Sequence, residues 1–159
     1  MTARLFSLLG LAALACQTGY NNAYDAEYKR LEQQQAAQQA AESAAHSEAS
    51  RYAAVVYFQT GSAVLDEAAT RQLNWFVGKM GPYPQATFDV QGFADSTGSE
   101  ATNQTLSNQR AQAVSQYLQS QGIQGSRIYA AAFSTSSPAA SNTTAQGRRD
   151  NRRVEITVR

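Results

Sequence analysis

The stretch that decides the fold is residues 92–118, GFADSTGSEATNQTLSNQRAQAVSQYL. It starts at the end of a short apolar segment over residues 87–93, which is predicted to be a strand. A turn of small polar residues follows, and residues 100–121 then show the apolar spacing of an amphipathic helix that ends at Gly122. A strand, a turn and a helix in this order form the building unit of an α/β domain.

The same alternation extends in both directions from this stretch. Strands are predicted over residues 53–58, 127–133 and 154–158, and a second amphipathic helix over residues 65–80 is stopped by Gly81-Pro82. Residues 134–144 are rich in Ser, Thr and Asn and are predicted to form a loop. The order β-α-β-α-β-β predicts an α/β (α+β) fold with a mixed sheet and helices packed on one face. This globular domain is expected to span residues 51–159.

Arg110 interrupts the apolar stripe of the helix predicted over residues 100–121. It lies four residues after Leu106 and four before Val114, and Asn103 faces the same way. A guanidinium group on a core-facing stripe is costly to desolvate unless it is paired. Asp95 is the expected partner because it follows the preceding strand, and α/β folds tend to bind ligands at such strand ends. The sequence pattern fits two alternatives: Asp95 and Arg110 belong to a ligand-binding site, or they form an ion pair with a purely structural role.

The composition argues against several classes of protein. The formal net charge is +1 and hydrophobic residues make up 43% of the chain, so the domain can bury a core but has no basic field to attract nucleic acid. The basic run at residues 148–153 is interpreted as a solvated or structural face. Cys16 is the only cysteine and His46 the only histidine, so neither an intrachain disulfide nor a His/Cys metal site is expected.

No catalytic arrangement is recognisable in the sequence. A serine nucleophile needs a general base, and no histidine or lysine stands in a recognisable arrangement with one. Spacing alone does not exclude a pair of glycosidase-type carboxylates, but nothing in the sequence favours such a pair. We therefore expect no catalytic residues, no metal and no cofactor.

Residues 1–15 are typical of a secretory signal peptide. Arg4 precedes an apolar run of 11 residues, which is too short to cross a membrane as a helix. Small residues and the lone Cys16 at the end of this run indicate a lipoprotein signal, in which the thiol carries a diacylglycerol. The triplet Ala13-Leu14-Ala15 would also suit an ordinary signal peptidase, so both modes of cleavage stay open.

Residues 16–50 are expected to form a lipid-anchored tether. Ala and Gln fill half of residues 25–50, which contain neither Gly nor Pro, so this segment favours a helix. Beyond Leu31 the face that begins with Tyr24 and Tyr28 shows only Gln and Ala, which cannot sustain a coiled-coil seam. The tether is therefore predicted to be partly helical and loosely packed.

Four motifs along the globular domain resemble those of one family. They are Tyr57-Phe58-Gln59-Thr60-Gly61-Ser62-Ala63 in the first strand, Gly92-Phe93-Ala94-Asp95-Ser96-Thr97-Gly98-Ser99 in the turn, Asn103, Leu106-Ser107 and Arg110-Ala111 in the helix, and Asn151-Arg152-Arg153-Val154-Glu155 in the closing strand. Their order and spacing are similar to those of the OmpA-like C-terminal domain of the peptidoglycan-associated lipoprotein type. The resemblance covers about residues 53–158, nearly the whole domain.

The resemblance implies a binding function in the bacterial envelope. In that family the domain binds the diaminopimelate residue of the peptidoglycan stem peptide. Asp95 matches the family's turn aspartate and would take the ligand's α-ammonium group, whereas Arg110 matches its helix arginine and would clamp the α-carboxylate. Asn103 would donate to and accept from the same end of the ligand.

The resemblance also implies a location and partners. With Cys16 lipidated, the protein would be anchored in the outer membrane, its domain would face the periplasm and bind peptidoglycan, and the membrane would thereby be attached to the wall. Other envelope proteins would be its further partners, and nucleic acid would not be one. The alternative is a wall-anchoring accessory of a flagellar or secretion machine that uses the same domain.

Two positions and one loop segment depart from the family's pattern. Ala94 replaces a threonine before the turn aspartate, and Gln59 stands where an aspartate often follows the phenylalanine of the first strand. Either change is expected to weaken ligand binding or to shift the ligand preference. The segment Ser134-Thr135-Ser136-Ser137-Pro138 also lacks the family's usual Gly-Glu pair.

Overall fold

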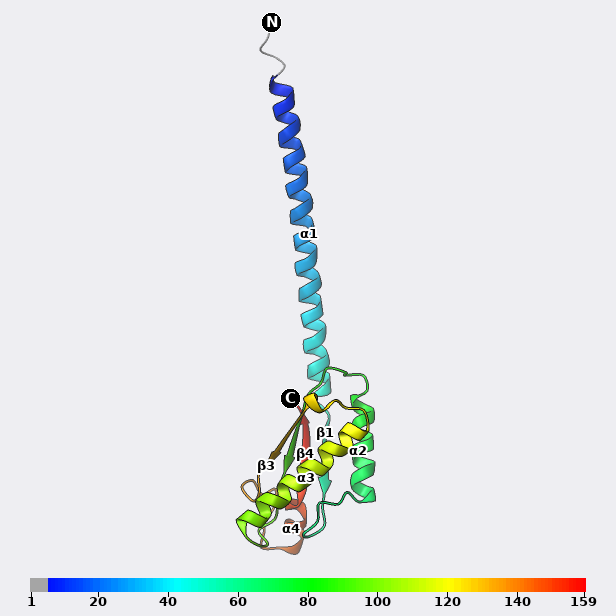
Figure 1. The fold of residues 1–159 in the computed structure, drawn as a ribbon, viewed down its shortest axis with the longest axis vertical. Coiled ribbons are helices and arrows are strands. Elements are labelled where there is room, and N and C mark those ends of the chain that lie inside the picture. Colours follow the sequence, from blue (N-terminus) through cyan, green and yellow to red (C-terminus); the bar gives the residue numbers. More distant parts are fainter. Residues whose placement is uncertain (1–5) are drawn as a thin grey trace. The chain divides into compact units, whose positions relative to one another are not determined.

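The chain forms two units, one that ends at residue 44 and one from residue 45 to residue 159. The computed structural model describes the backbone of residues 6–159 and the side chains of residues 23–159. Figure 1 shows the elements in chain order. The start of the expected signal peptide and the side chain of Cys16, the expected site of lipidation, lie outside the described residues.

Helix α1 (Phe6–Ala49) runs without a break over the residues assigned to the tether. The side chains of residues 23–48 are exposed throughout, and this includes the large apolar side chains of Tyr24, Tyr28 and Leu31. Over residues 23–48 the helix therefore depends on intrinsic helix propensity, to which Ala and Gln contribute most, and not on packing. None of the helices in the described part of the chain combines enough length with enough apolar character to span a membrane.

The second unit is built on a mixed sheet with the strand order β1-β4-β2-β3. Its strands are β1 (Ala53–Tyr57), β2 (Phe88–Gly92), β3 (Ile128–Ala132) and β4 (Arg153–Val158). β2 and β3 are parallel, and β4 is antiparallel to both of its neighbours. The last strand is thus inserted between β1 and β2, so Val154 lies opposite both Val56 and Gly92.

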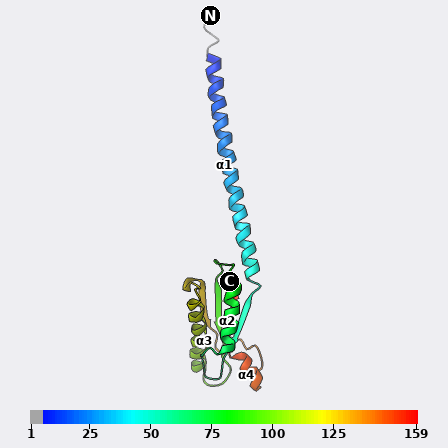
Figure 2. The same ribbon diagram turned by 90° about the vertical axis from the view of Figure 1, so that its right-hand side faces the viewer.

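Helices α2 (Glu67–Met80) and α3 (Glu100–Ser120) bury one face of this sheet. Along β1 and β2, buried residues alternate with more exposed ones, so the buried side chains share a face. Figure 2 shows α2 near β1 and α3 near β3. The apolar core side chains larger than alanine that have no exposed surface are Leu73, Phe76, Phe88, Val90, Val114, Leu118, Val154 and Ile156. The predicted mixed sheet with the two predicted helices on one face is confirmed, and each strand and helix predicted within residues 51–159 begins and ends within two residues of the observed one.

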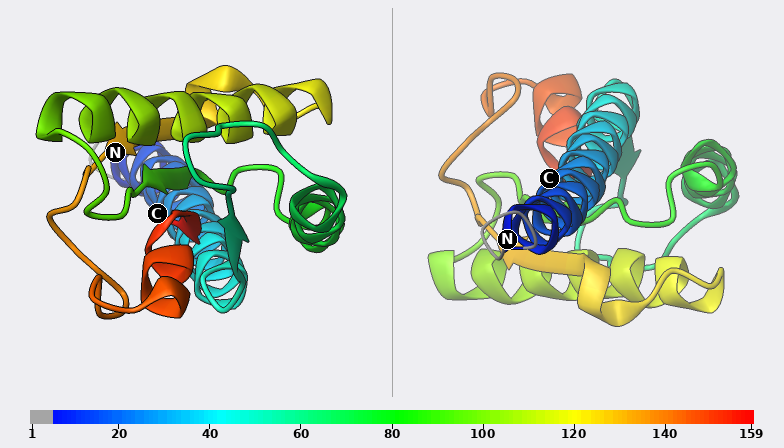
Figure 3. Two further views of the ribbon diagram at one scale, coloured as in Figure 1. Left: turned by 90° about the horizontal axis from the view of Figure 1, so that it is seen from below. Right: turned by 90° about the horizontal axis from the view of Figure 1, so that it is seen from above.

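Helix α4 (Ala145–Asn151) was not expected from the sequence. Thr144 caps it by accepting a hydrogen bond from the N–H of Gly147 at 3.0 Å. Its seven residues carry no apolar stripe, so the periodicity of the sequence could not indicate it. The end-on views of Figure 3 show α3 and α4 on opposite sides of the strands. The basic run at residues 148–153 is therefore divided between the end of a helix and the start of β4.

Gly92 allows α3 to approach the end of β2. A Cβ atom built at this position would lie only 2.1 Å from the backbone oxygen of Ser107, a separation that no side chain tolerates. The residues that follow Gly92, including Asp95, are thereby held close to the helix that carries Asn103 and Arg110.

Gly92→Ala is expected to lower the free energy of unfolding by about 2–3 kcal/mol, because the added methyl group forces β2 and α3 apart. Gly78→Ala in α2 is the matched control, since no atom beyond the adjoining helix backbone lies within 4 Å of a Cβ built there. Alanine at this exposed helical position should stabilise the domain by about 0.5–1 kcal/mol. Chemical denaturation measures both values. A Gly92→Ala variant as stable as the wild type would contradict the close approach.

Candidate functional site

Asp95 begins a tight turn directly after β2. Its Oδ1 accepts a hydrogen bond from the N–H of Thr97 at 2.9 Å, which is the pattern of an Asx-turn. The N–H of Ser96 donates to Oδ1 of Asn142 at 3.1 Å, so the turn is also tied to the loop that precedes α4. Asp95 is only 5% exposed, and its carboxylate is fixed by these contacts and by a charged partner.

The charged partner of Asp95 is Arg152. Nη1 of Arg152 donates to Oδ2 of Asp95 at 2.8 Å, and both side chains are largely buried. Nε of Arg152 donates to the carbonyl oxygen of Phe58 at 3.0 Å, so the guanidinium group is held at two points. Because the pair is shielded from water, removal of either partner would leave an uncompensated buried charge.

Asp95 is ionised at neutral pH. Burial alone would raise the pKa of its carboxyl group, but the hydrogen bonds from Arg152 and Thr97 outweigh burial and hold the pKa below its usual value. A carboxylate offers about four acceptor positions. Thr97 and Arg152 occupy one position on each oxygen, so each oxygen keeps room for a further donor.

Arg110 is completely buried, and three backbone carbonyl groups hold its guanidinium group. Nε donates to Ser62 at 2.9 Å, Nη1 to Phe93 at 3.0 Å and Nη2 to Gln59 at 3.2 Å. The guanidinium carbon also lies 5.3 Å from the ring centre of Phe58. Arg110 thereby joins α3 to the loop after β1 and to the residue that follows β2.

The prediction that Arg110 pairs directly with Asp95 is wrong. The donors of Arg110 go to backbone carbonyl groups, while Asp95 accepts from Arg152 and Thr97. Asp95 and Arg110 still interact through their charges. Burial lowers the pKa of Arg110 to about 10, and the negative charge of Asp95 opposes this shift. The guanidinium group therefore remains charged at neutral pH.

Two N–H donors of Arg110 have no acceptor among the residues that the structure describes. A guanidinium group has five donors, of which Nε carries one and each terminal nitrogen carries two. Nε and one N–H on each terminal nitrogen are occupied by the carbonyl groups. The two remaining donors lie on Nη1 and Nη2, the pair of nitrogens with which an arginine clamps a carboxylate.

Asn103 lies near the start of α3 and is 3% exposed. Its side-chain amide forms no hydrogen bond with any residue in the described part of the chain, so one acceptor and two donors are available. All three residues expected from the sequence are thus buried around the junction of β2 and α3. They are separate groups with unused hydrogen-bonding capacity and not one closed ion pair.

Three polar residues that the sequence analysis did not assign to the site organise its surroundings, namely Arg152, Asn142 and Asn151. Asn151 is fully buried, and its amide nitrogen donates to Ala140 at 2.8 Å and to Oδ1 of Asn142 at 2.9 Å. Its amide oxygen accepts from the N–H of Ala140 at 2.9 Å. The available signal was the closing motif that begins at Asn151, where polar residues directly precede a strand.

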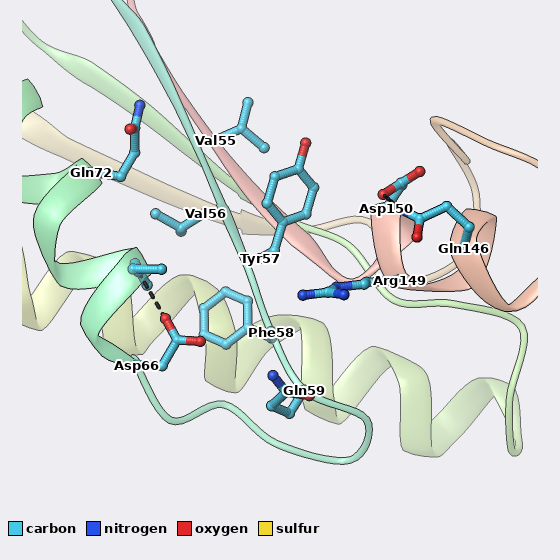
Figure 4. A pocket seen from close by; sticks show the side chains of 12 residues that line it. Val55, Val56, Tyr57, Phe58, Gln59, Asp66, Gln72, Gln146, Arg149 and Asp150 are labelled. Atoms are coloured by element: carbon cyan, nitrogen blue, oxygen red, sulfur yellow. Dashed lines mark hydrogen bonds between the residues drawn. The ribbon is translucent and has the colours of Figure 1, made fainter.

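Two cavities open beside the loop that holds Arg110. One has a volume of about 450 Å³, lies between β1, α2 and α4, and is lined in part by Tyr57, Gln59 and Arg149. Figure 4 shows Arg149 directed from α4 toward the end of β1. The other, of about 460 Å³, lies beside Gly61 and the first half of α3. Neither of these two cavities is lined by Asp95, Asn103 or Arg110.

Comparison with known proteins identifies the family. The model of the OmpA family matches residues 57–152, and the chain belongs to this family. The probable lipoprotein YiaD of Escherichia coli K12 is 41% identical over 103 residues, which are 65% of this chain and 47% of YiaD. The peptidoglycan-binding protein ArfA of Mycobacterium bovis is 40% identical over 103 residues, which are 65% of this chain and 32% of ArfA. The matched region is less than half of either relative.

Solved structures share the fold of the second unit. The peptidoglycan-associated lipoprotein from Burkholderia pseudomallei superposes with a TM-score of 0.63 at 24% identity, over 67% of this chain and 90% of that one. The cell wall anchor of the T6SS from Pseudomonas aeruginosa superposes with a TM-score of 0.59 at 28% identity, over 67% of this chain and 79% of that one. The resemblance expected from the four sequence motifs is confirmed.

Asp95→Asn is expected to lower the free energy of unfolding by about 2–4 kcal/mol at neutral pH, because Arg152 is left buried without its counter-charge. Folding lowers the pKa of Asp95, so its stabilising contribution is present above the unfolded pKa and is lost as pH falls through the folded value. The difference between wild type and variant should therefore shrink below about pH 4. Denaturation between about pH 2 and pH 7 measures this difference.

Asp89→Asn is the matched control, because Asp89 is 33% exposed and lies 3.9 Å from an exposed Arg159. A weak surface pair of this kind contributes at most about 1 kcal/mol. A stability difference for Asp95→Asn that stayed constant over the acid range would contradict the assigned ion pair.

Proposed function

We propose that this protein binds peptidoglycan without cutting it, and that Asp95, Arg110 and Asn103 hold the diaminopimelate residue of the stem peptide. The proposal rests on one observation about Arg110. Its guanidinium group is buried, and each terminal nitrogen has one N–H without an acceptor among the described residues. Buried donors without acceptors cost free energy. A ligand carboxylate is the acceptor whose geometry matches these two donors.

The charged groups of the ligand match the hydrogen-bonding positions that remain unused in the site. Diaminopimelate presents a free α-carboxylate and a free α-ammonium group on one carbon. The carboxylate would bind Arg110, and the ammonium group would use the free acceptor positions of Asp95. The amide of Asn103, which has no partner among the described residues, can serve either group. Charge-assisted hydrogen bonds of this kind are each worth about 1.5–3 kcal/mol.

Binding would include a local opening of the loop after β1. Arg110 has no exposed surface, and Gln59 and Ser62 cover it through their backbone carbonyl groups. Residues 59–61 of this loop are exposed on their other side. We propose that the loop moves outward when the ligand carboxylate takes up the guanidinium group. The carboxylate would then replace the carbonyl groups of Gln59 and Ser62 as acceptors, while the hydrogen bond from Nη1 to Phe93 would keep Arg110 in place.

We further propose that the mature chain begins at Cys16 and carries a lipid there. In this arrangement residues 16–50 are the tether, residues 51–159 bind the wall, and the protein is held in the outer membrane with its domain facing the periplasm. The apolar leader supports this arrangement, and so does the relative YiaD, which is described as a probable lipoprotein. Other envelope proteins would then lie within reach of the domain.

A second candidate function is that of a wall-anchoring accessory of a secretion or flagellar machine. The structural likeness to the T6SS cell wall anchor favours it. Both functions use the same wall-binding residues and differ in the partner of the anchored protein. Cross-linking of the full-length chain in cells, followed by identification of the attached proteins, distinguishes a machine component from a general link between membrane and wall.

Asp95→Asn and Arg110→Lys are expected to weaken binding of a diaminopimelate-containing stem peptide by about ten- to a hundredfold. Asparagine removes the charge that faces the ammonium group, and lysine keeps a positive charge but lacks the paired donors that match a carboxylate. Calorimetry with the full-length chain measures both affinities. A stem peptide with lysine in place of diaminopimelate should bind the wild type more weakly by a similar factor, because lysine lacks the second α-carboxylate.

The control is Arg71→Lys, the same change on an exposed arginine of α2, which should leave the affinity unchanged. Thermal unfolding of every variant separates loss of binding from loss of the fold. Equal affinity of the wild type for the two peptides, together with folded variants that bind as well as the wild type, would reduce the three residues to a structural role.

Cys16→Ser is expected to release the chain from the membrane fraction, because serine cannot carry the thioether-linked diacylglycerol and a single protein domain gains little membrane affinity without acyl chains. Mass spectrometry of the wild-type N-terminus should find a diacylglyceryl group on Cys16. An unmodified thiol on a chain that is free in the periplasm would contradict lipidation and favour cleavage by an ordinary signal peptidase.

A further inference from the structure

Ser134 is the most unusual residue near the site. It follows β3 and has a φ of +48°, which makes it the only residue other than glycine with a positive φ in the described part of the chain. The backbone conformation is left-handed, and glycine adopts it at much lower cost than serine. Ser134 is also 2% exposed, and its hydroxyl oxygen has no hydrogen-bond partner within the described residues.

Backbone contacts place Ser134 between the turn of Asp95 and the start of α3. The N–H of Ala94, the residue before Asp95, donates to the carbonyl oxygen of Ser134 at 2.8 Å. Residues before and after Ser134 form hydrogen bonds with α3. Thr135 donates to Glu100 at 3.1 Å, and the carbonyl oxygen of Ala132 accepts from Gln104 at 3.4 Å. Asn103 lies in the same turn of α3 as these two partners.

The fold alone gives no reason for a serine at position 134. A glycine would adopt the positive φ without strain and would remove the unpartnered hydroxyl group from the interior. Backbone strain and a buried polar group without a partner both destabilise the folded state, and both tend to be retained at binding sites. Ser134 combines both features, and a backbone hydrogen bond joins it to Ala94, the residue before Asp95.

We propose that the hydroxyl oxygen of Ser134 is a further contact for the α-ammonium group of diaminopimelate, an inference that rests on the proposed function. An ammonium group has three N–H donors, and in a buried site each needs an acceptor. Asp95 supplies one acceptor, and the amide oxygen of Asn103 and the hydroxyl oxygen of Ser134 supply the other two. The three acceptors come from the turn after β2, from α3 and from the segment after β3.

A contact from Ser134 would also account for two departures from the family's sequence pattern. Ala94 lacks a hydroxyl group where the resembling family has threonine, and Ser134 brings a hydroxyl group in the segment that lacks the family's usual Gly-Glu pair. The two positions are joined by the hydrogen bond from Ala94 to Ser134. The hydroxyl group is therefore retained at this edge of the site but is supplied by the neighbouring segment.

Ser134→Gly and Ser134→Ala test the inference together. Both remove the hydroxyl group, but glycine relieves the positive φ whereas alanine retains it. We expect both variants of the full-length chain to bind the diaminopimelate stem peptide about three- to tenfold more weakly in calorimetry. Ser134→Gly should at the same time unfold at a higher temperature than the wild type. The control is Ser137→Ala, an exposed serine of the same loop, which should leave both quantities unchanged.

The outcomes separate this inference from the proposed function. If the wild type binds the peptide, Asp95→Asn binds it more weakly and Ser134→Gly binds as well as the wild type, then the role of Ser134 is overturned and the site itself stands. If only Ser134→Ala loses affinity, the backbone conformation and not the hydroxyl group is responsible, and the inference is again overturned. If the wild type does not bind the peptide, the proposed function fails and this inference fails with it.

Discussion

The rest of the domain depends on the three hydrogen bonds that the buried guanidinium group of Arg110 donates to backbone carbonyl groups. These bonds join segments that share no regular ladder, namely the loop after β1, the end of β2 and the middle of α3. A neutral side chain at this position could not satisfy three carbonyl groups at once. The geometry of the site is therefore fixed by the residue that is proposed to bind the ligand, so folding and binding share one side chain.

The elements of this fold could be predicted because their buried faces have regular spacing. Leu73 and Phe76 repeat with the period of a helix, and Val154 and Ile156 with the period of a strand. The partners of the buried charges could not be predicted in the same way. Arg152 is separated from Asp95 by 57 positions in the sequence, and no local pattern indicates which of the nearby arginines reaches the carboxylate. The fold, in which β4 is inserted between β1 and β2, determines which arginine reaches Asp95.

The long loop before α4 shows another limit of sequence patterns. Its composition suggests an unstructured connection, yet side chains hold it at several points. Asn151 forms hydrogen bonds with Ala140 and Asn142, and Arg153 donates to the carbonyl oxygen of Ser137 at 3.1 Å. These contacts come from polar residues whose neighbours in sequence are also polar, so periodicity cannot reveal them. The same loop carries Ser134 and contacts the turn of Asp95, which explains how an irregular segment can help to shape a binding site.

The exposed helix α1 has a mechanical consequence. Because residues 23–48 bury no side chains, only the internal hydrogen bonds of the helix oppose its extension. A helix of this length spans about 40 Å at 1.5 Å per residue, and the same residues fully extended would span about 90 Å. A modest pull along the chain would therefore lengthen this segment turn by turn, and release would let it shorten again within microseconds, on the order of helix–coil relaxation. Such a segment behaves as a reversible spring, because it lengthens at forces that are too small to unfold the packed core.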